Sequence, residues 1–229
     1  MDISDFERRL GVSFKNPVLL EEALTHRSYL NEHPRWKYPH NERLEFLGDA
    51  VLELAVSEYL FQRFPEKPEG ELTNLRAALV RAETLAHVAH ELKVNDVIRL
   101  SRGEAKDVGR ARDVILANAC EAIVGAIYLD QGFHAVKDFL RKALLPKLED
   151  ILVSGSVRDP KSQFQEMAQE KMRTTPSYKV ISERGPDHAK TFSVGVYLGE
   201  TLIAKGEGLS KQEAQQEAAR EALHKKRWQ

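Results

Sequence analysis

The sequence predicts a multi-domain chain in which an all-α domain precedes a small α+β module of order α-β-β-β-α. Three observations support this fold class. Apolar residues recur with a helical period through most of residues 1–152. The small and polar segment 153–158 is typical of a linker. Residues 159–229 then change to a mixture of helical and alternating strand-like patterns.

Capping residues and helix breakers define the helices of the first domain. Asn16 followed by Pro17 predicts an N-cap and a helix that continues to Ala23. Prolines and glycine at 65–70 and polar residues at 101–110 predict loops. Asp113 is expected to cap a helix that Gly132 ends. The remaining pattern predicts helices at about 40–63, 71–92, 114–129 and 134–151.

The second module has its own start and turn signals. Asp159-Pro160 predicts the start of a helix, and three strand-like runs follow it. Residues 191–198 alternate in hydropathy, and Gly199-Glu200 predicts the tight turn into a returning strand. Ser210 and Glu213 have the spacing of a capping box. The helix after them carries Ala214, Ala218 and Ala222 on one face, which suits packing against a sheet.

Bulk composition excludes several classes of protein. No apolar run in the 229 residues approaches the roughly 20 that cross a bilayer, so we expect no membrane partner. The acidic start, Met1–Asp5, lacks the features of a signal peptide. A single cysteine, Cys120, excludes an internal disulfide and fits a cytoplasmic location. Residues 158–229 carry 13 Lys and Arg against 10 Asp and Glu, whereas the preceding part is acidic.

Carboxylates within apolar segments are the strongest chemical signal. Glu45 and Asp49 are one helical turn apart, and Asn118 and Glu121 have matching spacing on a second apolar helix. If these helices pack face to face, four oxygen-bearing side chains meet, as a Mg²⁺ site requires. Two alternatives remain open: Glu45 pairs with Arg76 or Arg81, or Asn118 binds a backbone group. Cys120 is expected to be a small core residue.

A family resemblance narrows these alternatives. The segment His40-Asn41-Glu42-Arg43-Leu44-Glu45-Phe46-Leu47-Gly48-Asp49 resembles the hallmark motif of the ribonuclease III family, residue for residue. Similar residues occur in the family's order at 24–28, 69–70, 75–77 and 116–130. The resemblance implies a helical endonuclease domain that acts as a homodimer on double-stranded RNA. It also implies metal-site roles for Glu45, Asp49, residue 118 and Glu121, catalytic roles for Asp49 and Glu121, and auxiliary roles for Glu42 and Glu69.

Position 118 departs from the family pattern, which most often has aspartate there. Asn118 leaves the site with one negative charge fewer, although an amide oxygen can still bind a hard cation. Natural variation and an engineered substitution both explain this residue. A cleavage-impaired regulator that only binds double-stranded RNA is therefore an alternative function, and a helical scaffold with an accessory binding module is a further one.

Residues 158–228 resemble a double-stranded-RNA-binding domain over its whole length. Such domains read duplex shape, phosphates and 2′-hydroxyls rather than base edges. The resemblance implies three contact regions, which are an exposed helix face, the loop after the first strand and the start of the last helix. Their residues are Ser162, Gln165 and Glu166, then Pro186, Asp187 and His188, then Lys211, Gln212 and Gln215.

The sequence thus predicts a Mg²⁺-dependent endoribonuclease that hydrolyses both strands of duplex RNA, with Mn²⁺ as a substitute cation. We expect 5′-phosphate and 3′-hydroxyl ends. The resemblance implies ribosomal RNA precursors and structured messenger RNAs as substrates.

Overall fold

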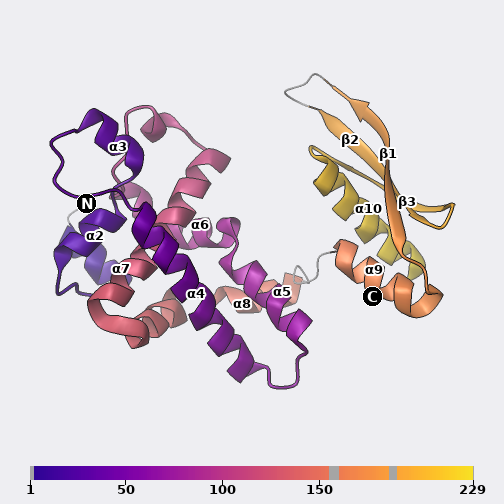
Figure 1. Ribbon diagram of the computed structural model, residues 1–229, viewed down its shortest axis with the longest axis horizontal. Helices are drawn as coiled ribbons and strands as arrows, with labels where there is room; N and C mark the ends of the chain where they lie inside the picture. Colours follow the sequence, from indigo (N-terminus) through magenta and orange to yellow (C-terminus); the bar gives the residue numbers. More distant parts are fainter. Residues whose placement is uncertain (1–2, 155–159, 186–189, 229) are drawn as a thin grey trace. The chain divides into compact units, whose positions relative to one another are not determined.

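The computed structural model describes residues 3–154, 160–185 and 190–228. The chain forms two compact units, residues 1–157 and 158–229, and each is described by itself. The first unit is helical, and two short 3₁₀ helices join its longer elements (Figure 1). The bounds are α1 Ile3–Leu10, α2 Pro17–Ala23, α3 Arg27–Glu32, α4 Glu42–Arg63, α5 Glu69–Val80, α6 Ala82–Glu91, η1 Val94–Asp96, η2 Glu104–Lys106, α7 Arg110–Ala143 and α8 Lys147–Ser154.

Two predicted helices are each divided in the structure. The single helix expected at 71–92 is α5 followed by α6, because Arg81 adopts an extended conformation with ψ of 150°. Thr84 Oγ1 donates to the carbonyl of Ala78 across this break and satisfies the end of α5. The helix expected at 134–151 is the end of α7 followed by α8. Pro146 lies between them and cannot donate the backbone hydrogen bond that a continuous helix needs.

Three other boundaries also differ from expectation. Helix α7 begins at Arg110, so Asp113 lies within its first turn and does not cap it. The Asp113 carboxylate instead lies 2.9 Å from Nε2 of His90. Gly132 interrupts α7 as predicted, with φ of 80° inside the helix. Helix α8 continues through Ser154, so the first two residues of the expected linker are helical.

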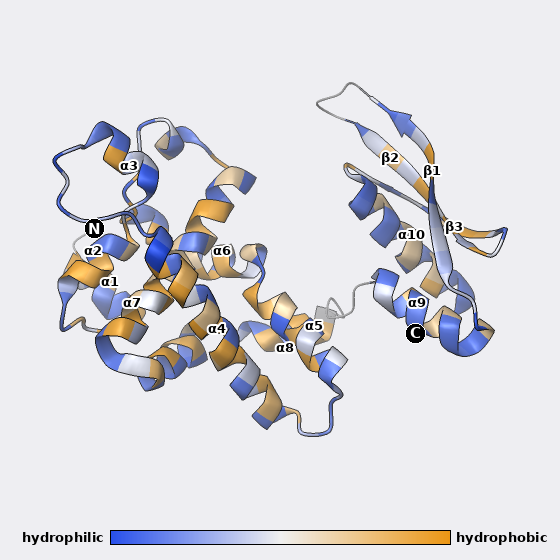
Figure 2. Ribbon diagram, viewed as in Figure 1, coloured by the Kyte–Doolittle hydropathy of each residue, from blue (hydrophilic) through white to orange (hydrophobic). Residues whose placement is uncertain are grey.

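The core of the first unit lies around α4 and α7, which pack together more extensively than any other pair of helices. Hydrophobic residues recur along α4, α6 and α7 (Figure 2). Leu52 and Val56 of α4, Leu85 of α6, and Ile123 and Ile127 of α7 are almost completely buried. The packing of α4 on α7 fixes the positions of the acidic side chains, because both helices belong to one rigid core.

The second unit has the predicted order α9 Pro160–Met172, β1 Pro176–Arg184, β2 Thr191–Leu198, β3 Thr201–Gly208 and α10 Lys211–Lys226. The strands form an antiparallel sheet of order β1-β2-β3. Ala214, Ala218 and Ala222 are buried, and α10 packs on β2, β3 and α9. This close packing needs small residues on the sheet as well, since a Cβ on Gly206 would stand 2.1 Å from the backbone nitrogen of Ala218. The predicted fold class is confirmed.

Within the described residues, no helix combines the length and the apolar character that crossing a bilayer requires.

Candidate metal centre and nucleic-acid interface

Helices α4 and α7 touch backbone to backbone at two glycines. A Cβ on Gly48 would stand 1.8 Å from the carbonyl oxygen of Glu121. A Cβ on Gly125 would stand 2.3 Å from the carbonyl oxygen of Leu44. No larger side chain fits at either point, so the crossing depends on glycine at both positions. Sequence periodicity alone did not single out these residues, although an isolated glycine inside a helical pattern is a recognised signal of close approach.

This crossing brings the four predicted metal-site residues together. Glu45 and Asp49 flank Gly48 on α4, and Glu121 lies against Gly48 on α7. The Asn118 amide donates a hydrogen bond to Glu45. The charges of Glu45 and Asp49 both act on Glu121. The predicted pairing of the two helices therefore occurs.

The electrostatics show that the negative charge of the cluster is uncompensated. Burial raises the pKa of Glu121 to about 7, and the neighbouring carboxylates of Asp49 and Glu45 add to the rise. Burial also raises the pKa of Glu45, with the charges of Glu42 and Asp49 acting in the same direction. The hydrogen bond from Asn118 opposes this rise. A site in which ionised carboxylates are disfavoured is one that a cation would stabilise.

Neither of the alternative ion pairs of Glu45, with Arg76 or with Arg81, occurs in the structure. Arg76 donates to Ser57 Oγ at 2.9 Å, and Arg81 pairs with Glu83 at 3.5 Å. Within the described ranges, no salt bridge involves Glu45, Asp49 or Glu121. The donor set is all oxygen, which suits Mg²⁺ or Mn²⁺.

The cluster is an open site and not a closed metal cage. Within the described part of the chain, no three His, Cys, Asp or Glu side chains converge as a ready ligand set. Glu45 and Glu121 are partly exposed and Asp49 is exposed, although all three lie in apolar segments of the sequence. Mg²⁺ typically binds one or two carboxylates and retains several waters, so the arrangement fits that ion.

Of the two auxiliary residues, only Glu42 interacts with this cluster, whereas Glu69 lies beside the later part of α4, at a pocket that Phe61 and Arg76 also line. Glu42 begins α4 and pairs with Arg27 at 3.0 Å and with His40 at 3.7 Å. Its charge still acts on Glu45. Glu69 begins α5 and accepts a hydrogen bond from Thr73 at 2.9 Å. Cys120 is buried, and burial raises the pKa of its thiol to about 12, so it is a core residue as expected.

The second unit presents its predicted contact residues on two helices. Ser162, Gln165 and Glu166 are exposed on one face of α9. Lys211 and Gln212 are exposed at the start of α10, where Ser210 Oγ accepts from the backbone of Glu213. The predicted loop residues Pro186, Asp187 and His188 lie outside the described residues.

Each of the two units matches a known protein family. A ribonuclease-III-like family matches residues 16–148, and a double-stranded RNA binding motif matches residues 160–226. A ribonuclease 3 of Oceanobacillus iheyensis is 48% identical over 223 residues and covers 97% of each chain. A ribonuclease 3 of Streptococcus gordonii is 47% identical over 220 residues, which are 95% of this chain and 93% of that one.

The chain belongs to the ribonuclease III family. Solved structures agree, since the nuclease domain of ribonuclease III from Campylobacter jejuni superposes with a TM-score of 0.57 and 42% identity. That match covers 63% of this chain and 99% of the Campylobacter chain. The family comprises endoribonucleases that act on double-stranded RNA, so the predicted class of enzyme and its need for a divalent metal are confirmed.

Sequence reasoning missed an apolar feature of the ribonuclease III unit. Phe46 lies on α4 between Glu45 and Asp49 of the hallmark motif, and its side chain is 82% exposed. It borders an open pocket of about 630 Å³ that Leu19, Leu47 and Leu129 also line. Phe61, on the same helix, is 72% exposed. Large aromatic side chains in such positions indicate a contact surface.

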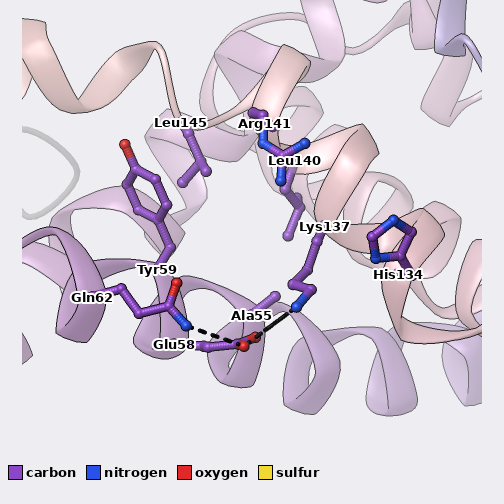
Figure 3. A pocket seen from close by; sticks show the side chains of 9 residues that line it. All are labelled: Ala55, Glu58, Tyr59, Gln62, His134, Lys137, Leu140, Arg141 and Leu145. Carbon is purple, nitrogen blue, oxygen red and sulfur yellow. Dashed lines mark hydrogen bonds and ion pairs between the residues drawn. The ribbon is translucent and has the colours of Figure 1, made fainter.

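A smaller cavity of about 120 Å³ lies between α4 and the second half of α7 (Figure 3). Lys137 and Gln62 both point toward the Glu58 carboxylate and interact with it. Arg141 and His134 pair with Asp138 instead. Because its polar groups are already matched within the protein, this cavity does not resemble a catalytic site.

Two further residues of the RNA-binding unit were also missed. Lys161 Nζ donates to Gln215 Oε1 at 2.7 Å, which places a lysine of α9 beside the predicted contact surface of α10. Glu183 of β1 pairs with Lys211. Neither contact has a sequence signal, because each joins residues far apart in the chain.

Proposed function

We propose that this ribonuclease III family member hydrolyses both strands of duplex RNA at the cluster of Glu45, Asp49, Asn118 and Glu121. The observation that carries the proposal is the raised pKa of Glu121 at the crossing of α4 and α7. It indicates a set of oxygen ligands whose negative charge has no counter-charge. The expected cation is Mg²⁺, and Mn²⁺ would substitute because it accepts the same hard ligands.

The protein residues have distinct roles in this proposal. Asp49 and Glu121 are the catalytic pair, and they would hold the cation from opposite helices. Glu45 supports them, and the Asn118 amide orients Glu45 by donating a hydrogen bond to its carboxylate. A bound divalent cation would offset phosphate charge and favour water as the nucleophile. Water attacks phosphorus, the bond to the 3′ oxygen breaks, and that oxygen takes up a proton. The ends are 5′-phosphate and 3′-hydroxyl.

The exposed aromatic surface supports a homodimer formed through the nuclease unit. Phe46 is a large, exposed apolar side chain, and in a dimer it would enter the pocket that Leu19, Leu47 and Leu129 line on the second copy. Phe46 and this pocket lie on the same face of the nuclease unit. In a twofold dimer, each Phe46 would therefore enter the pocket of the other copy. Such a dimer would carry two acidic clusters, one for each strand of a duplex.

The second unit would supply duplex recognition. The exposed face of α9 and the start of α10 would contact phosphates and 2′-hydroxyls, with Lys211 near the N-terminus of α10 as a phosphate contact. Pro186, Asp187, His188, Gln212 and Gln215 complete the proposed surface. Substrates of this chemistry include ribosomal RNA precursors and structured messenger RNAs, and the proposed location is cytoplasmic.

The test uses the purified full chain and a labelled RNA duplex with Mg²⁺, with Ca²⁺ or with EDTA. We expect cleavage of both strands with Mg²⁺ alone and no cleavage of a single-stranded control. Glu121→Gln should abolish cleavage but retain binding. If the unaltered chain binds duplex RNA and never cuts it in Mg²⁺, the alternative of a cleavage-impaired regulator replaces this proposal. Asn118, which removes one negative charge from the cluster, is the residue that would explain such a result.

A further inference from the structure

Lys211 is engaged by an acidic residue of its own domain. Its Nζ lies 3.1 Å from Oε1 of Glu183, which is near the end of β1. The same ammonium lies 5.5 Å from the centre of the Phe192 ring, at the start of β2. Glu183 and Phe192 are paired across the two strands, so both contacts come from one end of the sheet. The lysine is thus held in a defined position and remains accessible, with 58% of its side chain exposed.

We infer that Glu183 competes intramolecularly with RNA phosphate for Lys211 and thereby limits the affinity of this chain for duplex RNA. The inference rests on the proposed function of Lys211 as a phosphate contact. A phosphate that approaches Lys211 must either displace the Glu183 carboxylate or lie beside a second negative charge. Both events cost free energy that a lysine without this partner would not require.

The competition also predicts an unusual salt dependence. A lysine that contacts phosphate normally contributes about one unit to the slope of log affinity against log salt. A lysine already neutralised by a carboxylate contributes less, because binding exchanges one anionic partner for another. Added salt weakens the exposed Glu183–Lys211 pair as well. The effect of Glu183 should therefore be largest at low salt and should fade at high salt.

If the Glu183–Lys211 pair had a purely structural role, removing it would lower the stability of the fold. Both side chains are substantially exposed, with 58% of Lys211 and 37% of Glu183 accessible, and such pairs contribute little to stability. The core of this unit is formed instead by residues such as Phe164, Val196 and Ala218. Removing the Glu183 charge should therefore leave folding nearly unchanged. A change confined to RNA binding would distinguish competition from structural support.

The test measures binding of the full chain to a long RNA duplex over a range of salt, with Ca²⁺ in place of Mg²⁺ to prevent cleavage. Glu183→Gln should tighten binding by about twofold to fivefold at low salt and steepen the salt slope by up to about one unit. The matched control is Glu200→Gln, which removes the same charge from the β2–β3 turn. That turn joins Leu198 to Thr201, whereas Lys211 lies over Phe192, at the opposite end of β2. The control should change affinity much less.

A double-mutant cycle decides how Glu183 acts. In a Lys211→Ala background, Glu183→Gln should no longer tighten binding, since its target is gone. Equal tightening by Glu183→Gln and Glu200→Gln would overturn the inference in favour of a general charge effect. Tightening that persists without Lys211 would overturn it in favour of direct repulsion between Glu183 and RNA. If Lys211→Ala itself leaves affinity and salt slope unchanged, the proposed phosphate contact fails, and that result is separate from the other two. Thermal unfolding of each variant verifies that the fold is intact.

Discussion

Neutralising Glu121 should stabilise the metal-free protein while it removes activity. Burial and the charges of Asp49 and Glu45 raise the pKa of Glu121 from 4.5 to about 7. At about 1.36 kcal/mol per pKa unit, the full shift corresponds to about 3.4 kcal/mol of destabilisation when the group is ionised. Glu121 is partly exposed, so solvent screening reduces this figure, and we expect a gain of about 1–2 kcal/mol for Glu121→Gln.

The pH dependence has a definite sign. Because the pKa is raised in the folded state, the native protein binds the proton more tightly than the unfolded chain does. The penalty is absent below about pH 4.5, grows as pH rises toward 7, and stays constant above that value. The stability gain of Glu121→Gln should therefore be present at pH 8 and largely lost near pH 4.

The assay is urea or thermal unfolding of the nuclease unit in EDTA at both pH values. The control is Glu53→Gln, an exposed glutamate on α4, which should leave stability nearly unchanged. Saturating Mg²⁺ should stabilise the unaltered chain more than the Glu121→Gln variant, because only the former retains the full ligand set. The reasoning would be refuted by a variant no more stable than Glu53→Gln at pH 8, or by a gain of equal size at pH 4.

Three further changes test other parts of the structure. Asn118→Asp should preserve or raise cleavage and lower the Mg²⁺ concentration needed for half-maximal rate; a sharp fall would mean that the site depends on the amide. Gly48→Ala should destabilise the nuclease unit by about 2 kcal/mol or more and lower cleavage, because its Cβ would overlap the Glu121 carbonyl; unfolding and cleavage rates unchanged from the parent would contradict this. Phe46→Glu should convert the proposed dimer to a monomer in sedimentation equilibrium, whereas the exposed-residue control Glu53→Gln should not; an unchanged dimer would place the interface elsewhere.

Local patterns predicted much of the fold because their causes are local. Asn16 and Ser210 cap helices as expected, Gly132 interrupts α7, and Gly199 forms the tight turn between β2 and β3. The errors have equally specific causes. The break at Arg81 lies in a segment of strong helical periodicity, and a hydrogen bond from Thr84 to the Ala78 carbonyl spans it. Periodicity contains no information about such a contact.

The sequence by itself indicated the fold class, the family and the spacing of Glu45 with Asp49 and of Asn118 with Glu121, because helical periodicity places each pair on one side of its own helix. Only the tertiary structure decided that α4 and α7 pack together and how close they come. The contact at Gly48 and Gly125 sets that distance, and the resulting burial, together with the nearby charges of Asp49 and Glu45, raises the pKa of Glu121. The tertiary structure also decided that Phe46 faces solvent and that Glu183 pairs with Lys211. Exposure and long-range charge pairing depend on which surfaces meet, and spacing along the chain does not specify that.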